Sequence, residues 1–330
     1  MRKTEPDVLV IGAGVSGLTT AVCLAEAGLH VIVQAAAPPQ QTTSAVAGAI
    51  WGLHLVGMDD RVAGWARLTL GTLREQAGSP ATGIQIRSGI DASQRPQPDP
   101  RPDPPSWTSG VGERLRCDSA DLPAGYASGW RFTAPVITMP VYLDYLLEMF
   151  VRAGGRLRSG RCFASLAAAA DQSAAPVIVN CAGIGARDLV PDPAMMPVRG
   201  QVVVTANPGI TDFFIGHGEQ PGEVTYLFPH DGTVVLGGTE IAGDWSLEPD
   251  PDTATSILAA CTAIEPRLRG AAVLAHRVGL RPVRPRVRLE AEGISDGRRV
   301  VHDYGHGGAG ITLSWGCAVD VTEQVLRSFG

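Results

Sequence analysis

The chain of 330 residues has few lysines, few aromatic residues and little charge. Lys3 is the only lysine among 27 basic residues, and we interpret this bias as the mark of a GC-rich bacterial genome rather than of a function. Aromatic residues make up 5% and charged residues 18% of the chain, and 33 acidic residues give a net charge of −6. A general electrostatic surface for nucleic acid or for an anionic membrane is therefore excluded.

Long apolar runs are absent as well. None approaches the roughly 18 residues of a spanning helix, so we expect no membrane segment. The basic start followed by apolar residues up to Ala37 imitates a signal peptide, but Glu26 and His30 interrupt it, and the C-terminus is no peroxisomal signal. We therefore expect a cytoplasmic protein.

Cysteine is sparse and lacks the spacing of a metal site. The six cysteines form no C-x-x-C pair and show no pairing with histidine, so we predict no metal site and interpret them as buried thiols. Apolar residues make up 45% of the chain, and the length is roughly that of two domains.

A nucleotide-binding motif stands near the start. Residues 7–12 are typical of a buried parallel strand, residues 16–27 of a helix that stops at Gly28, and residues 31–33 of a second strand. The turn between the first strand and the helix reads G-x-G-x-x-G, with Gly12, Ala13, Gly14, Val15, Ser16 and Gly17. In this context the motif predicts a dinucleotide whose pyrophosphate lies at the helix N-terminus.

One element of that motif is missing. The acid that would bind the adenosine ribose is absent, because no Asp or Glu occurs between Glu26 and Asp59. Gln34 stands near its place and can hydrogen-bond a hydroxyl group. The choice between NAD and FAD stays open on these residues.

Further elements indicate two interleaved units. Residues 41–52 are rich in hydroxyl groups and small side chains, which suits either ligand contacts or an ordinary capped turn. Helices are expected at 59–77 and 138–153, a proline-rich surface loop at 91–105, and a second buried strand ending in glycines at 176–185. Residues 198–206 and 224–238 favour an antiparallel sheet.

The C-terminal part combines arginines with a glycine-rich loop. Arg284, Arg286 and Arg288 alternate and predict a solvated face of an extended edge, whereas Arg281 is a candidate carboxylate clamp or a structural ion pair. Four glycines within 305–310 precede a helix expected at 313–327 and offer a second backbone-lined site. His306 suits a base or a structural role. Two such sites fit a ligand with two polar ends, as FAD has.

Together these motifs resemble the flavin-dependent D-amino-acid oxidase family, which includes D-aspartate oxidases. The matching blocks are residues 12–17, 42–44, 198–201, 226–229, 237–239, 279–288 and 304–308. The resemblance implies an α/β fold in which a Rossmann-like FAD-binding domain is interleaved with a mainly antiparallel substrate domain. The expected boundaries are 1–55, 139–190 and 276–330 for the FAD domain and 56–138 and 191–275 for the substrate domain.

The resemblance also implies roles for individual residues. Arg281 matches the arginine that clamps the substrate carboxylate, Tyr226 the tyrosine that hydrogen-bonds it, and Gly308 the glycine whose carbonyl accepts from the amine. Contacts to non-covalently bound FAD are implied for residues of the G-x-G-x-x-G turn and for Thr42, Thr43, Ser44, Gly48, Ala49, Ile50, Cys162, Ala182, Gly183, Gly307, Gly308, Ala309, Gly310, Ile311 and Thr312.

The implied reaction is oxidative deamination of a D-amino acid. Hydride transfer to flavin N5 and reoxidation by oxygen would give a 2-oxo acid, ammonia and hydrogen peroxide. Gly52, His54, Gly216 and Glu240 are the implied substrate-pocket residues. The D-aspartate branch has arginines where this chain has Gly216 and Glu240, which favours neutral or basic substrates, although a solvated surface Glu240 is an alternative.

Alternative functions are a D-aspartate oxidase, a flavin-dependent dehydrogenase that does not use oxygen, and a flavin-binding protein without turnover. The expected partners are the D-amino acid and oxygen, with homodimer formation left open.

Overall fold

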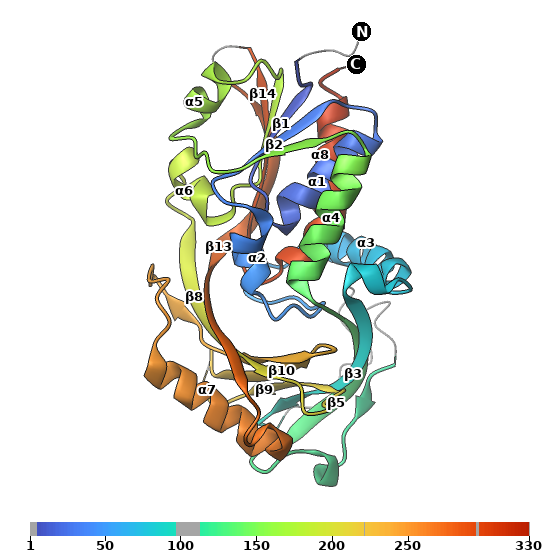
Figure 1. Cartoon of the computed structure of the whole chain (residues 1–330), viewed down its shortest axis with the longest axis vertical. Helices are drawn as coiled ribbons and strands as arrows, with labels where there is room; N and C mark the ends of the chain where they lie inside the picture. The colour runs from blue at the N-terminus through green and yellow to red at the C-terminus, as the bar shows by residue number, and fades with distance from the viewer. Residues whose placement is uncertain (1–4, 97–112, 221, 295–296, 330) are drawn as a thin grey trace.

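The computed structural model describes residues 5–96, 113–220, 222–294 and 297–329 (Figure 1). Fourteen strands of these residues join in one continuous sheet, in the order β4-β5-β3-β9-β10-β11-β8-β13-β14-β7-β1-β2-β6, with β12 paired to β8. One half of this sheet is parallel and the other mainly antiparallel. The predicted α/β fold, a Rossmann-like part interleaved with an antiparallel part, is confirmed.

The parallel half contains the strands that the sequence pattern indicated. Its members are β1 (Val8–Ile11), β2 (Val31–Gln34), β6 (Arg156–Arg158), β7 (Val177–Asn180) and β14 (Arg299–His306). The central strand β1 is buried throughout and pairs in parallel with β2 on one side and β7 on the other. Such two-sided burial explains why its sequence is a continuous apolar run rather than an alternating one.

Helices cover this half and enclose the largest core cluster. The long helices are α1 (Val15–Glu26), α3 (Asp60–Gln76), α4 (Met139–Arg152) and α8 (Gly310–Leu326), and short α5 (Leu166–Asp171) and α6 (Ala186–Leu189) also belong here. Figure 1 shows α1, α4 and α8 side by side against the sheet. Leu18, Leu146 and Val321, one from each of these helices, are fully buried in this cluster.

The antiparallel half forms a curved sheet with one covering helix. Its strands are β3 (Ile84–Ser93), β4 (Leu115–Arg116), β5 (Ser128–Ile137), β8 (Met196–Ala206), β9 (Phe213–His217), β10 (Val224–Pro229), β11 (Thr233–Gly237) and β12 (Ile241–Ala242). The amphipathic helix α7 (Pro251–Ile264) packs Ile257 and Cys261 against this sheet.

The long strand β13 (Val273–Gly293) connects the two halves (Figure 1). It pairs with β8 along its first part and with β14 along its second part. The predicted solvated edge of arginines is confirmed at Arg286, which is exposed, but is wrong at Arg284 and Arg288, which are partly buried. Arg284 hydrogen-bonds Asp192, and Arg288 bonds both Glu290 and the Tyr304 hydroxyl, because each guanidinium spans neighbouring elements.

Three smaller expectations need correction. Residues 91–93 of the predicted loop belong to β3, and its residues from 97 onward lie outside the described part of the chain. The C-terminal helix starts at Gly310 rather than at Leu313. Cys162 is exposed, and Cys23 and Cys117 are only partly buried, so the cysteines are not uniformly buried thiols. Among the described residues, no helix has the length and apolar character needed to cross a membrane.

Candidate active site

One large cavity runs along the junction of the two halves. It encloses about 780 Å³, within the range of natural cofactor sites. One end is lined by the turn after β1, and the other by side chains of β3, β9 and β10. The cavity therefore connects the predicted nucleotide motif with the antiparallel sheet.

Two positions of the turn at residues 12–17, Gly12 and Gly17, are packed too tightly for a side chain. A Cβ on Gly12 would lie 2.3 Å from the Cys181 carbonyl oxygen, and one on Gly17 would lie 2.0 Å from the Gly12 carbonyl oxygen. Gly12 also has a φ of +110°, which favours glycine. These contacts hold the N-terminus of α1 against β1 at the cavity.

That N-terminus is suited to an anion. The N-cap residue of α1 is Gly14, which has no side chain to bond the first amide groups, and the first turn of α1 contains no acidic residue. Ser44 Oγ accepts a hydrogen bond of 3.1 Å from the Val15 amide, which ties the hydroxyl-rich segment to this turn. A helix N-terminus at the cavity wall with no competing carboxylate fits the pyrophosphate of a dinucleotide.

Gln34, at the end of β2, is buried and lines the cavity. Its amide nitrogen donates to the carbonyl oxygens of Arg158 and Arg161, at 3.2 and 3.5 Å. These bonds fix the side chain at the position where the sequence motif lacks an acid.

The second glycine loop packs directly on residues 54 and 55. A Cβ on Gly307 would lie 1.9 Å from the Leu55 carbonyl oxygen, and one on Gly308 would lie 2.5 Å from His54 Cδ2. The Gly308 amide donates to the His54 carbonyl at 3.0 Å. Close backbone approach therefore requires glycine at both positions.

His306 links this loop to the first turn. Its Nε2 lies 3.0 Å from Asp303 Oδ1, its Nδ1 lies 3.5 Å from Ser16 Oγ, and both His306 and Asp303 are buried. Between the two alternatives for His306, this geometry favours the structural role, because both ring nitrogens face protein groups.

Most predicted cofactor residues line the cavity. They are Gly12, Ala13, Gly14, Val15, Ser16, Thr42, Thr43, Ser44, Gly48, Ala49, Ile50, Cys162, Ala182, Gly183, Gly307, Gly308, Gly310 and Ile311. Gly17, Ala309 and Thr312 are not part of its wall. Thr312 instead exchanges two hydrogen bonds with the Gly52 backbone, at 2.8 and 3.1 Å, and so anchors a neighbouring wall segment.

The predicted carboxylate clamp lies within the wall of the cavity. Arg281 projects from β13 over Gly200, where a Cβ would lie 2.5 Å from Arg281 Nη1, and it donates to the Thr239 carbonyl at 2.9 Å. Tyr226 lies over Gly237 and Gly238, and its ring stacks on Phe228 at 4.7 Å. Burial raises the pKa of Tyr226 despite the opposing Arg281 charge, so its hydroxyl stays a hydrogen-bond donor.

Glu240 and His54 form a pair beside this clamp. Glu240 Oε1 lies 2.9 Å from His54 Nε2, and the Glu240 side chain is only 13% exposed, so the alternative of a solvated surface residue is wrong. Burial opposes ionisation, but the hydrogen bond and charge of His54, with Arg281 and His217, hold the pKa of the Glu240 carboxyl below its usual value.

Of the four predicted substrate-pocket residues, Gly52 and His54 line the cavity, whereas Gly216 and Glu240 are not part of its wall. A Cβ on Gly216 would meet Tyr126 and Phe214, on the face of β9 that packs under α7. Because side chains alternate along a strand, its neighbours Ile215 and His217 face the cavity instead.

The sequence analysis missed several titratable residues of the wall, and three of them lie together at the antiparallel end, namely Asp91, Arg114 and His217. His217 Nε2 lies 2.9 Å from Asp91 Oδ1, and an Arg114 nitrogen lies 4.0 Å from Asp91 Oδ2. The hydrogen bond to Asp91 is the main cause that raises the pKa of His217, although burial acts in the opposite direction. Asp91 and His217 are far apart in the chain and lie in no motif. The alternation of side chains along their strands was the only sequence feature that could have indicated that both face the cavity.

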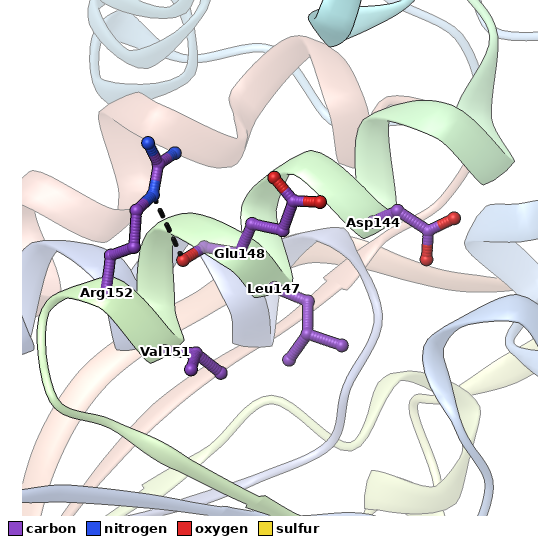
Figure 2. A pocket seen from close by; sticks show the side chains of 5 residues that line it. All are labelled: Asp144, Leu147, Glu148, Val151 and Arg152. Atoms are coloured by element: carbon purple, nitrogen blue, oxygen red, sulfur yellow. Dashed lines mark hydrogen bonds between the residues drawn. The ribbon is translucent and has the colours of Figure 1, made fainter.

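A second, smaller hollow lies on the outer side of α4 (Figure 2). It is lined by Asp144, Leu147, Glu148, Val151 and Arg152. The bond drawn there is a contact of 3.4 Å from Arg152 Nε to the Glu148 carbonyl, one turn earlier in the helix. This is a solvated helix face, and the chemistry lies in the large cavity.

Comparisons with known proteins show the family of this chain. A family model described as FAD dependent oxidoreductase matches residues 7–324. A D-amino-acid oxidase of Rubrobacter xylanophilus is 47% identical over 94% of this chain and 93% of its own length. A human D-aspartate oxidase is 35% identical over 96% of this chain and 94% of its own length. The solved glycine oxidase of Bacillus cereus has 17% identity and a TM-score of 0.77, covering 98% of this chain and 96% of that one.

The chain belongs to the FAD-dependent oxidoreductase family in which the D-amino-acid oxidases are found, as the sequence motifs predicted. FAD is the cofactor of this family. The residues present fit it, because Gly12 and Gly14 line the cavity at the first turn, Gly17 allows this turn to pack closely, and the α1 N-terminus without an acid in its first turn suits its phosphates.

Proposed function

We propose that this protein is an FAD-dependent oxidase of neutral or basic D-amino acids. The observation that supports it most is the placement of Arg281 and Tyr226 together in the cavity wall, in the same cavity as Gly308. A planar guanidinium binds a carboxylate through two parallel hydrogen bonds and so sets its position and its angle. The relatives named D-amino-acid oxidase and D-aspartate oxidase support this substrate class.

The chain's own residues orient the substrate. Arg281 and the Tyr226 hydroxyl hold the α-carboxylate, and the Gly308 carbonyl accepts a hydrogen bond from the α-amine. With both groups held, the α-C–H of one enantiomer is directed toward the cofactor end of the cavity. FAD, when bound, supplies the hydride acceptor and passes two electrons to oxygen. The remaining protein groups orient substrate and exclude water.

The domain division is part of the same proposal. Residues 1–55, 139–190 and 276–330 would hold the cofactor, and residues 56–138 and 191–275 would hold the substrate. The sheet supports it, since all strands of the parallel half lie within the first set of residues and the pairing of β13 with β8 joins the two parts.

The alternatives of the same fold are less well supported. A D-aspartate oxidase must hold a second carboxylate, but the partly buried Glu240 beside His54 would repel one. A dehydrogenase would use the same clamp and differ only in its reaction with oxygen.

The test is a substrate panel on the purified yellow holoprotein. We expect D-Met, D-Ala and D-Arg to bleach the flavin without oxygen and to yield peroxide in air, with D-Asp slower than these. A flavin that stays oxidised with every D-amino acid would contradict the proposal. Bleaching without reoxidation in air would identify a dehydrogenase, and D-Asp as the fastest substrate a D-aspartate oxidase.

A substitution at Glu240 tests the preference for basic side chains. Because its lowered pKa keeps Glu240 ionised at neutral pH, Glu240→Gln removes a negative charge near the clamp. We expect kcat/KM for D-Arg relative to D-Met to fall about fivefold, as for the loss of one partly solvated ion pair. Glu75→Gln, an exposed acid on α3, should leave the ratio unchanged. An unaltered ratio in Glu240→Gln would exclude this role.

A further inference from the structure

The far end of the cavity contains charged side chains in line with the clamp. On the face of the sheet toward the cavity, Asp91 of β3 is in register with Ile215 of β9, and Ile215 is in register with Tyr226 of β10. Two strand spacings separate Asp91 from Tyr226, which amounts to about 10 Å. A side chain as long as that of arginine or lysine can cover most of this distance from a substrate held at Tyr226.

The charge at this end depends on the protonation of the His217 imidazole. Asp91 pairs with His217 at 2.9 Å and with Arg114 at 4.0 Å, and Glu240 pairs with His54 at 2.9 Å. Arg281 is assigned to the α-carboxylate. With a neutral His217 imidazole, Arg114 and the carboxylates of Asp91 and Glu240 sum to a net charge of minus one, and protonation of His217 brings this sum to zero.

These pairs are accessible to a ligand. The side chains of His217 and Asp91 are 45% and 31% exposed, and both line the same cavity as Arg281. A cationic substrate group that enters here can replace the imidazolium as the partner of Asp91, whereas it would be repelled by a protonated His217.

We propose that Asp91 and His217 form a second recognition end of the substrate cavity, where Asp91 binds a cationic D-amino-acid side chain and protonation of His217 competes with it. This inference rests on the proposed oxidase function and adds the residues that select side-chain charge. It predicts that the preference for cationic over neutral side chains increases as His217 loses its proton.

The direction of the pH effect follows from the contacts. The hydrogen bond to Asp91, followed by the charges of Asp91 and Glu240, raises the pKa of His217 above its ordinary 6.5 although burial acts against this. His217 is thus fully protonated well below pH 6.5 and loses its proton as the pH rises through its raised pKa. A cationic substrate gains affinity over the same interval.

The measurement is the ratio of kcat/KM for D-Arg to that for D-citrulline between about pH 6 and pH 9. D-citrulline has nearly the same shape without the charge, so effects of pH on the α-amine and on the flavin cancel in the ratio. We expect the ratio to rise about fivefold with pH. His217→Asn should reduce this rise to less than half and give a high ratio already at low pH.

Two further variants make the test specific. Asp91→Asn should lower the ratio about fivefold at high pH, because the carboxylate is the cation's partner. His276→Gln, an exposed histidine on β13 outside the cavity wall, should behave as the parent protein. A ratio that is constant with pH in the parent, or an equally large rise in His217→Asn, would overturn the inference. Absence of turnover with every D-amino acid, D-citrulline included, would instead contradict the proposed function.

Discussion

Arg281→Ala is expected to lower kcat/KM for D-amino acids by at least about 10²-fold while the purified protein stays yellow. Two hydrogen bonds between a guanidinium and a carboxylate contribute about 1.5–3 kcal/mol each, and the substitution removes both. The loss should appear in kcat as well as in KM, since a carboxylate held by Tyr226 alone no longer fixes the direction of the α-C–H. Within the protein, the variant loses the bond to the Thr239 carbonyl, which is a small part of the stability.

Two companion variants separate the clamp from a general effect of charge. Arg286 lies on the same strand and is exposed, so Arg286→Ala removes an equal charge outside the cavity wall and should keep near-parental kinetics. Arg281→Lys retains the charge but not the planar fork, and we expect an intermediate loss. Steady-state kinetics with D-Met and the flavin absorbance of each variant provide the measurement. Unchanged kinetics in Arg281→Ala would refute the assignment of Arg281 as the clamp.

The parallel half of the fold was predictable because its signals are local. Two-sided burial makes β1, β2 and β7 continuous apolar runs, and the glycines that end β1 and β7 are next to them in the chain. In the β13 segment the sequence was informative only at the exposed Arg286, for the opposite reason. Its prolines and alternating arginines resemble an exposed edge, but Arg284 and Arg288 pair with Asp192 and Tyr304, which are distant in the chain.

The candidate site shows the same division between local and distant information. Residues inside motifs, such as Gly12, Ser44 and Gly307, could be named from the sequence because the motif itself lines the cavity. Asp91 and His217 are 126 positions apart and meet only through the pairing of β3 with β9. Gly216 was predicted to face the cavity, but its neighbours Ile215 and His217 do so instead. A shift by one residue along a strand moves a side chain to the other face of the sheet.

Gly17→Ala is the other substitution for which we expect a large effect, here on cofactor binding. A Cβ at this position would lie 2.0 Å from the Gly12 carbonyl oxygen and 3.4 Å from Cys181 Cβ, and the nearer contact is with backbone that cannot rotate away. The N-terminus of α1 must therefore move from β1, and its amide groups move with it. We expect a cost of about 1–3 kcal/mol in the free energy of unfolding, as for an overpacked core.

The affinity for FAD should fall with the same displacement, with Kd rising at least about tenfold, equivalent to about 1.4 kcal/mol. Flavin fluorescence titration of the apoprotein measures this, and urea unfolding measures the stability. Gly71→Ala is the matched control, because Gly71 is an exposed glycine inside α3 with open space around its Cβ position. Alanine there should stabilise the helix by about 0.5–1 kcal/mol and leave FAD binding unchanged. If Gly17→Ala also bound FAD with the parental Kd, the close packing of residues 12–17 would not be what positions the phosphate-binding amides.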